Sequence, residues 1–247
     1  MIQNLHIFKS PEELASQFAL QLMGWIDNHT GEAFHLAISG GKTPELLFTI
    51  LAEQYADSMQ WQKVHFWWVD ERMVSPEDAE SNFGTAHRLL LSKIIIPEEN
   101  IHPIKGENNS EAEALSYSEQ IQVKLTLQND WPVFDLILLG IGDDGHTASI
   151  FPDQINLIDS NRICEVAVHT QSGQKRITLT GKVINNSLKV CFLITGISKA
   201  DRLTEILANK AKANLLPAAH IHPKDGLLAW YVDKAAAKMR DTPMKRS

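Results

Sequence analysis

Short apolar runs recur along the chain, and longer stretches with a single apolar stripe separate them. A short apolar run that ends in glycine or in charged residues is typical of a strand buried on both faces of a sheet. We expect strands of this kind at residues 34–38, 64–69, 134–139, 163–168, 190–195 and 227–232, with an edge strand at 2–8 and a strand of period two at 177–180.

Helices are expected between these strands, where apolar residues recur at helical spacing or follow helix-start signals. Ser10 and Pro11, for example, suit the N-cap and the first position of a helix. The expected helices lie at about 11–28, from 44 onward, and at 84–93, 110–127, 199–209 and 234–239, with a connector at 97–109. This alternation predicts an α/β fold with a mainly parallel sheet and helices on both of its faces.

The domain organisation follows from what the pattern lacks. The 247 residues contain no internal repeat, low-complexity tract or Gly/Ser linker. We therefore interpret residues 1–247 as one domain, with room for a small subdomain formed by about 150–190.

Acidic residues and a histidine follow the strand at 134–139, among the glycines of segment 140–145. Glycine permits tight turns and a close approach of backbone to a ligand. In open α/β sheets, ligands bind at the carboxyl ends of the strands. His146 is therefore interpreted as a tuned acid or base rather than as a turn cap. Asp144 either orients the imidazole or satisfies backbone N–H groups of the turn.

The same stretch matches the G-x-G-x-x-G pattern of dinucleotide-binding proteins. We reject that interpretation because Asp143 and Asp144 would face the anionic pyrophosphate. Pro152 would also end the following helix after about two turns.

A second candidate element follows the strand at 34–38 and comprises Ser39, Gly40, Gly41, Lys42 and Thr43. Thr43 suits the cap of the next helix, and Pro44 suits its first position. Uncovered backbone N–H groups, the positive end of a helix and the Lys42 ammonium together predict a phosphate site. The alternative is an ordinary strand–turn–helix corner. The loop is shorter than a nucleotide-binding P-loop.

Charged residues also follow the strand at 64–69, namely Asp70, Glu71 and Arg72. Their place at a strand end directs them to the same ligand edge. Arg72 can offer a bidentate fork to phosphate. Its alternative role is a surface ion pair with Asp70 or Glu71.

Charge and composition narrow the classes of function. The net charge is −7 with no basic run before the last residues, Lys245 and Arg246. A nucleic-acid partner is not expected, because phosphate backbones need clustered Lys and Arg. No apolar stretch is long enough to span a membrane, and no signal peptide is recognised, so we expect a cytoplasmic protein without a membrane partner.

The cysteines and histidines do not predict a metal site. Cys164 and Cys191 lie in apolar runs and are interpreted as buried thiols of a reduced compartment, with a disulfide as the weaker alternative. His220 and His222 would share one face of a strand, but no acidic or cysteine partner stands at ligand spacing. Ser149 lacks a G-x-S-x-G elbow, which argues against a serine nucleophile.

Five motifs in order resemble those of the 6-phosphogluconolactonase family. They are residues 39–44, residues 69–72 with 81–82 after them, residues 140–152, residues 176–180, and residues 216–219 with Trp230 and Asp233 beyond. The resemblance implies a modified Rossmann-like three-layer sandwich shared with glucosamine-6-phosphate deaminases and ribose-5-phosphate isomerases. It also implies hydrolysis of 6-phospho-D-glucono-1,5-lactone to 6-phospho-D-gluconate in the oxidative pentose phosphate pathway.

The resemblance assigns roles residue by residue. It implies that His146 is the general base and that the loop 39–43, Arg72 and Arg176 hold the phosphate, with Asp70 beside them. Family members often carry a lysine several residues before the arginine matching Arg176, whereas here Lys175 is adjacent to it, so its role is left open.

A δ-lactone is an activated ester, so one imidazole acting on water suffices, and we expect neither a metal nor another cofactor. The expected partner is a small sugar phosphate, and the expected state is a monomer or small homo-oligomer. The rival functions are an amino-sugar-phosphate deaminase or isomerase, and a non-catalytic sugar-phosphate sensor. The first is disfavoured because Ser149–Pro152 lacks the glutamate expected after the histidine.

Overall fold

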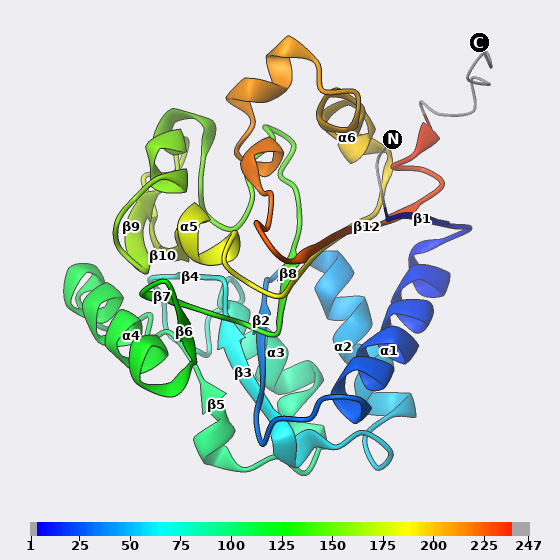
Figure 1. The fold of residues 1–247 in the computed structure, drawn as a ribbon, viewed down its shortest axis with the longest axis vertical. Coiled ribbons are helices and arrows are strands. Elements are labelled where there is room, and N and C mark those ends of the chain that lie inside the picture. The colour runs from blue at the N-terminus through cyan, green and yellow to red at the C-terminus, as the bar shows by residue number, and fades with distance from the viewer. Residues whose placement is uncertain (1–3, 239–247) are drawn as a thin grey trace.

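A seven-stranded sheet forms the centre of the computed structural model, which describes residues 4–238. All neighbouring strands in this sheet pair in parallel. In spatial order they are β1 (Leu5–Phe8), β12 (Leu227–Asp233), β11 (Lys189–Ile194), β8 (Leu136–Leu139), β2 (Phe34–Ile38), β3 (Val64–Trp68) and β5 (Ile101–His102) (Figure 1). The expected mainly parallel sheet is thus confirmed, and β1 is an edge strand as predicted.

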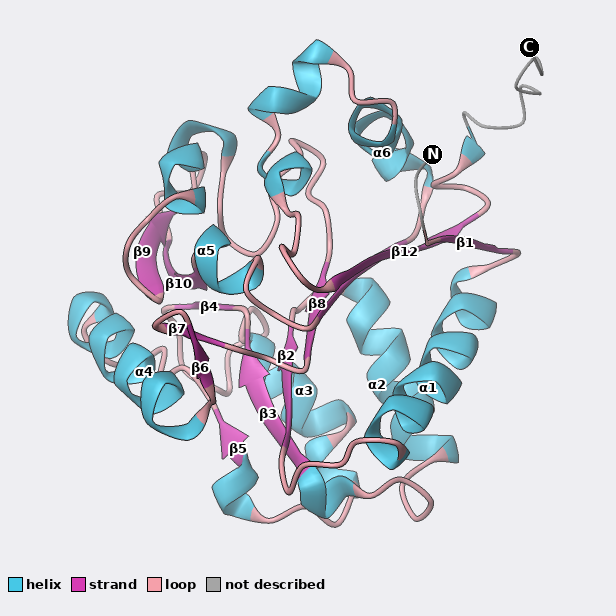
Figure 2. Cartoon of the chain, viewed as in Figure 1, coloured by secondary structure: helices cyan, strands magenta, loops and turns pink. Residues whose placement is uncertain are grey.

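Helices cover both faces of this sheet, which makes the three-layer arrangement (Figure 2). One face carries α1 (Pro11–Asp27), α2 (Lys42–Gln54) and α3 (Asn82–Leu89). The other side carries α4 (Ser110–Lys124), α5 (Gly181–Ile184) and α6 (Ala200–Leu207). Short 3₁₀ helices complete the chain: η1 (Trp61–Lys63), η2 (Leu91–Lys93), η3 (Glu98–Asn100), η4 (Pro152–Ile158), η5 (Ile197–Lys199), η6 (Ala211–Leu215) and η7 (Pro217–His220).

A smaller antiparallel sheet lies beside the main one and consists of β4 (Asp70–Arg72), β10 (Lys175–Leu179) and β9 (Cys164–Val168). Residues 70–72 were expected merely to follow a strand, whereas they form a strand of their own in a second sheet. A two-stranded ribbon pairs β6 (Leu127–Gln128) with β7 (Trp131–Pro132).

The hydrophobic core explains why the apolar runs became central strands. All four residues of β8 are buried, as expected for a strand covered on both faces. Phe192 of β11 and Trp230 of β12 stack with ring centroids 4.2 Å apart. One continuous core cluster joins the main sheet to β9 and β10. The interpretation of residues 150–190 as a subdomain, and of 1–247 as one domain, stays a prediction.

The start of α2 differs from the expectation. The helix begins at Lys42 with Gly41 as its N-cap, so Thr43 does not cap it and Pro44 is its third residue. The Thr43 hydroxyl lies 2.7 Å from that of Thr195 instead. Gly41 has a φ of +102°, which favours glycine and lets the helix begin two residues earlier than predicted.

Several element boundaries also differ. The expected connector at 97–109 contains β5, which extends the main sheet. Residues 234–237 form turns rather than a helix, and Met239 lies outside the described residues, as do residues 2 and 3 of the expected first strand and the Lys245–Arg246 tail. Just before Pro152, an isolated antiparallel bridge pairs Thr147 with Ile150.

Candidate active site

A cleft of about 310 Å³ opens at the carboxyl ends of β2 and β8. These two strands are neighbours, and the chain proceeds from them in opposite directions across the sheet, which makes this the topological switch point where ligands bind. The residues that line the cleft are Ser39, Gly40, Gly41, Asp70, Arg72, Asn82, Gly140, Ile141, Gly142, Asp143, His146, Ala148, Arg176 and Lys199.

The imidazole of His146 is held by the carboxylate of Asp144. The His146 Nδ1 atom lies 2.6 Å from Asp144 Oδ1, and the same oxygen accepts from the His146 backbone N–H at 3.0 Å. Partial burial would raise the pKa of Asp144, but these hydrogen bonds outweigh it and lower that pKa to about 2. An ionised carboxylate can only accept, so Nδ1 carries the proton and Nε2 is the basic nitrogen.

Glycines shape the loop that carries this pair. A Cβ atom at Gly142 would lie 2.1 Å from His146 Nδ1, so only glycine leaves room for the ring. Gly145 has a φ of +90°, and a Cβ there would lie 2.6 Å from Leu216 Cδ2. The glycines that match the G-x-G-x-x-G pattern therefore make room for the His146 ring and for the tight turn before it.

Two arginines lie opposite each other on neighbouring strands of the small sheet. Arg72 of β4 and Arg176 of β10 are direct partners in the antiparallel ladder, and both line the cleft. Burial and the neighbouring Arg72 charge lower the pKa of Arg176. The Nε–H groups of both arginines are buried and have no hydrogen-bond partner among the described residues. Like charges placed opposite each other are unfavourable unless an anion lies between them.

Asp70 is buried beside the arginines and is fixed by a serine. Its Oδ2 atom accepts from the Ser149 hydroxyl at 2.7 Å, and Ser149 in turn lies 3.5 Å from Arg176 Nη1. Ser149 is fully buried, so it orients Asp70 instead of attacking a substrate. This agrees with the absence of a nucleophile elbow in the sequence.

Glu71 points away from the cleft and holds the start of α3. Its carboxylate accepts from the backbone N–H groups of Arg72, Asn82 and Phe83 at 2.7–2.8 Å and from the Ser81 hydroxyl at 3.1 Å. Burial raises the pKa of Glu71, and the backbone hydrogen bonds oppose that rise. Its role is therefore structural, and it fixes Arg72 indirectly.

Asn82 joins the two phosphate-binding candidates. Its Nδ2 atom donates to the Asp70 carbonyl at 2.8 Å, while its Oδ1 atom lies against Gly40 so closely that a Cβ there would be 1.8 Å away. Asn82 thus ties the loop after β2 to β4. A role for Asn82 was not predicted, although Ser81 and Asn82 belonged to one of the motifs.

Three residues considered as phosphate-binding candidates in the sequence analysis do not line the cleft. Lys42 is exposed on the first turn of α2, and Thr43 turns to Thr195. Lys175 alternates to the other side of β10, where its Nζ atom lies 3.4 Å from the Ser110 hydroxyl. Their roles in binding stay predictions, and the geometry gives most support to Ser39, Gly40 and Gly41.

Lys199 is the main residue that sequence reasoning missed. It lines the cleft from the end of η5, and its Nζ atom lies 2.5 Å from Asp143 Oδ1. The Asp143 pKa is lowered, first by this hydrogen bond. The signal was present, because Lys199 follows β11 at its carboxyl end. Only the strand order reveals that β11 lies next to β8.

Other predicted features lie away from the cleft. Cys164 and Cys191 are free and buried, and burial raises the pKa of each thiol to about 12. His220 and His222 are not on a strand. Within residues 4–238, no group of three or more His, Cys, Asp or Glu side chains is arranged to hold a metal ion, and no helix is long and apolar enough to cross a bilayer.

Comparisons with known proteins identify the family to which the chain belongs. The sequence matches the family described as glucosamine-6-phosphate isomerases/6-phosphogluconolactonase over residues 9–230. It is 47% identical to a 6-phosphogluconolactonase of Haemophilus influenzae, covering 83% of this chain and 87% of that one. It is 44% identical to a 6-phosphogluconolactonase of Aggregatibacter actinomycetemcomitans, covering 92% and 94%. The solved structure of a protein called devB superimposes with a TM-score of 0.92 at 41% identity, covering 96% and 99%. The resemblance noted in the motifs is confirmed, and the chain belongs to the glucosamine-6-phosphate isomerase/6-phosphogluconolactonase family.

Proposed function

We propose that this enzyme hydrolyses 6-phospho-D-glucono-1,5-lactone to 6-phospho-D-gluconate in the oxidative pentose phosphate pathway. The relatives that carry the name 6-phosphogluconolactonase support this reaction. The observation that carries the proposal is that the cleft combines one oriented imidazole with two opposed arginines. A cytoplasmic location and a monomeric or small homo-oligomeric state belong to the same proposal.

The phosphate would be bound at the arginine end of the cleft. Arg72 and Arg176 each present a buried Nε–H with no partner among the described residues. The first turn of α2 adds backbone N–H groups that have no acceptor within the helix, and the positive end of the helix dipole adds to their attraction. A dianion placed there would relieve the repulsion between the two guanidinium groups. Charge-assisted hydrogen bonds of this kind contribute about 1.5–3 kcal/mol each.

The lactone ring would then lie toward His146, which borders both the cleft and an adjoining hollow that Asp144 also lines. The Nε2 atom takes a proton from water while the water oxygen forms a bond to C1. The tetrahedral intermediate collapses by breaking the bond between C1 and the ring oxygen, and the imidazolium returns its proton to that oxygen. Asp144 stabilises the transient imidazolium, and general-base assistance contributes roughly 10²–10⁴-fold.

Two features favour direct attack by water on the lactone over attack by a serine hydroxyl. Ser149 is fully buried and bonded to Asp70. The imidazole has its own carboxylate partner, which makes it a competent base.

Lys199 extends the cationic lining of the cleft on the side of β11, where it forms an ion pair with Asp143. We assign it a supporting role in holding the anionic substrate.

The experiment compares kcat/KM for the phosphorylated lactone and for gluconolactone, with spontaneous hydrolysis subtracted. Arg72→Ala and Arg176→Ala should each reduce the preference for the phosphorylated lactone by about 10- to 100-fold, which corresponds to the loss of one or two charged hydrogen bonds. His146→Asn should lower kcat for both lactones and leave the preference intact. Arg162→Ala, a surface arginine paired with Glu165, is the matched control.

Equal use of both lactones by the wild type would contradict the phosphate assignment. Near wild-type kcat in His146→Asn would exclude this imidazole as the base. Release of ammonia from glucosamine 6-phosphate, without lactone hydrolysis, would instead assign the other activity in the family's description.

A further inference from the structure

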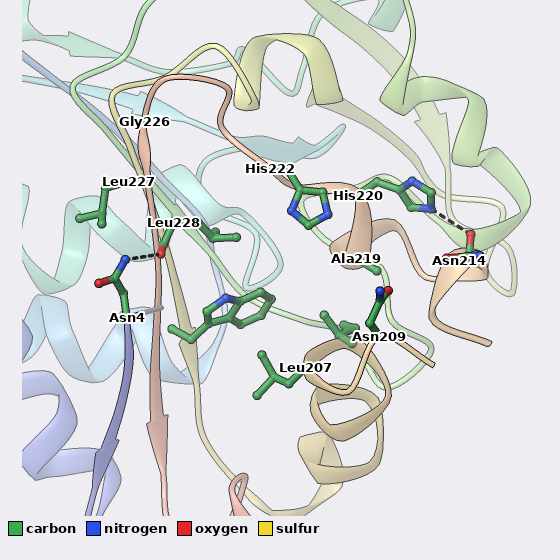
Figure 3. Close-up of a pocket in the computed structure, with 12 residues that line it drawn as sticks. Asn4, Leu207, Asn209, Asn214, Ala219, His220, His222, Gly226, Leu227 and Leu228 are labelled. Carbon is green, nitrogen blue, oxygen red and sulfur yellow. Dashed lines mark hydrogen bonds between the residues drawn. The ribbon is translucent and has the colours of Figure 1, made fainter. Parts of the chain in front are cut away.

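A second, larger cavity lies between the end of α6 and the start of β12, and among residues 4–238 it shares no lining residue with the catalytic cleft. Its volume is about 740 Å³, which is in the range of small-molecule sites. Figure 3 shows the start of β12 with Leu227 and Leu228 on one side, Leu207 at the end of α6 opposite, and His220 and His222 closing a third side. We call it the rear cavity.

The chemistry of the rear cavity is polar but uncharged. Among residues 4–238, no Asp, Glu, Lys or Arg lines it. A charged ligand would therefore lose its hydration without gaining an ionic partner. Three asparagines and two histidines supply groups that both donate and accept, and the remaining surface is mostly aliphatic, with the indole of Trp230.

The orientation of two of these polar groups is defined. His220 Nε2 lies 2.9 Å from the Asn214 carbonyl, which can only accept, so Nε2 donates and Nδ1 is left as an acceptor. Asn4 donates to the Leu228 carbonyl at 3.3 Å, and its amide oxygen is an acceptor without a partner among residues 4–238. Mixed donors and acceptors above an aliphatic floor match a saturated ring bearing hydroxyl groups. The lining contains one indole, Trp230, and one of its faces stacks on Phe192, so little aromatic surface is left for a flat heteroaromatic ring.

Both walls of the rear cavity are attached to the loop that carries His146. From the α6 side, Arg202 Nε donates to the Asp143 carbonyl at 3.1 Å, and Lys199 pairs with the Asp143 carboxylate. From the η7 side, the Ala218 backbone N–H donates to the Gly145 carbonyl at 3.2 Å. A change in the spacing of the walls would therefore reach residues 143–146 from two directions.

We infer that the rear cavity is a second binding site for a neutral cyclic polyol, and that its occupation strengthens the hold on the His146 loop. The ligand would pack against Ile206 and Leu207 at the end of α6, a helix of eight residues in which only Ala200 and Leu203 are buried. Extra packing there fixes the helix that holds Asp143. Binding and catalysis are then coupled through one short, physically continuous lobe, residues 197–220.

The test titrates the full-length protein with myo-inositol, which has neither a phosphate nor a lactone, and follows backbone amide shifts by NMR. Saturable shifts are expected around Asn209 and Gly226 and at residues 143–146. The inference about catalysis rests on the proposed function, and there kcat/KM should rise about fivefold at saturation, the lower end of common allosteric couplings.

Ala219→Phe should abolish these shifts because its side chain fills the cavity, whereas Ala112→Phe, an exposed substitution on α4, should not. His222→Leu, at an exposed position of the rim, provides a second variant that removes a polar group without touching the core. Shifts that persist in both cavity variants would overturn the inference, as would displacement of myo-inositol by 6-phosphogluconate or the absence of any saturable shift.

The two proposals can fail separately. If lactone hydrolysis is absent while the shifts at 143–146 persist and disappear in Ala219→Phe, the proposed function is wrong and the second site stands. If hydrolysis is present and unaffected by saturating myo-inositol, the coupled site is wrong and the proposed function stands.

Discussion

Acidification from about pH 7 to about pH 5 should destabilise the fold through three histidines whose rings lie next to one another on neighbouring strands. His35 of β2 and His65 of β3 are register partners with ring centroids 5.1 Å apart. His65 stacks on His102 of β5 at 5.3 Å, and His65 Nδ1 lies 3.0 Å from His102 Nε2. His102 also stacks on Trp67 at 4.0 Å, and Trp67 Nε1 donates to His35 Nδ1.

Burial is the main reason that these imidazoles stay neutral. It lowers the pKa of His35 to about 4 and that of His102 to about 3, and it also lowers the pKa of His65. Repulsion from neighbouring imidazoles adds to the effect on the pKa values of His35 and His102, and the nearby Lys124 adds to it for all three histidines. Of the other facing groups, Glu99 favours the charged form of His65, whereas His29 disfavours that of His35, whose backbone N–H donates to Asp135.

The direction in which the free energy of unfolding changes with pH follows from proton linkage. Each folded-state pKa lies below the unfolded value of ~6.5, so the unfolded state binds more protons as the pH falls below that value. Stability is therefore fully present above about pH 6.5 and declines toward the folded-state pKa values near 3–4. For His102, which is 4% exposed, the 1.5 pH units between ~6.5 and ~5 correspond to about 2 kcal/mol.

Urea unfolding followed by circular dichroism at both pH values measures this effect. The free energy of unfolding of the wild type should fall by at least about 2 kcal/mol between pH 7 and pH 5. His102→Phe keeps the stacking on Trp67 but cannot titrate, so its fall should be smaller by about 2 kcal/mol. His102→Gln is a second non-titrating variant that retains a polar group toward His65.

His87→Gln removes an exposed histidine of α3 and should leave the difference between the two pH values unchanged. An equal fall in the wild type, His102→Phe and His102→Gln would refute the reasoning, because it would assign the acid sensitivity to other groups.

Three further predictions concern the active site. Gly40→Ala should lower kcat/KM by about tenfold or more because its Cβ collides with Asn82 Oδ1, and the double variant with Asn82→Ala should recover part of that loss if the clash is the cause. Asp144→Asn should lower kcat by about 10²-fold with little change in KM; a kcat near the wild-type value would exclude Asp144 as the partner of His146. Glu71→Gln should reduce the free energy of unfolding by about 1–3 kcal/mol, since an amide cannot accept all four hydrogen bonds, while kcat of the folded fraction stays near wild type.

Local patterns in the sequence determined most of the strands of the main sheet. A continuous apolar run such as 136–139 has few alternatives to a central strand, because its side chains must be covered on both faces. The helix after Ser10 and Pro11 was also predictable, since capping and first-turn preferences act within a few residues. The turn at Gly41 was not predictable. Glycine adopts positive and negative φ almost equally well, so the sequence does not show at which residue the chain turns into the helix.

The tertiary structure decided which chemical groups meet. Arg72 and Arg176 are far apart in the sequence, and only the pairing of β4 with β10 places them opposite each other. Lys199 reaches the cleft only because β11 lies beside β8. Strand order and register depend on packing over the whole chain, whereas periodicity reports only which face of a segment is buried. The sequence alone could therefore name His146 and the two arginines, but their common cleft required the fold.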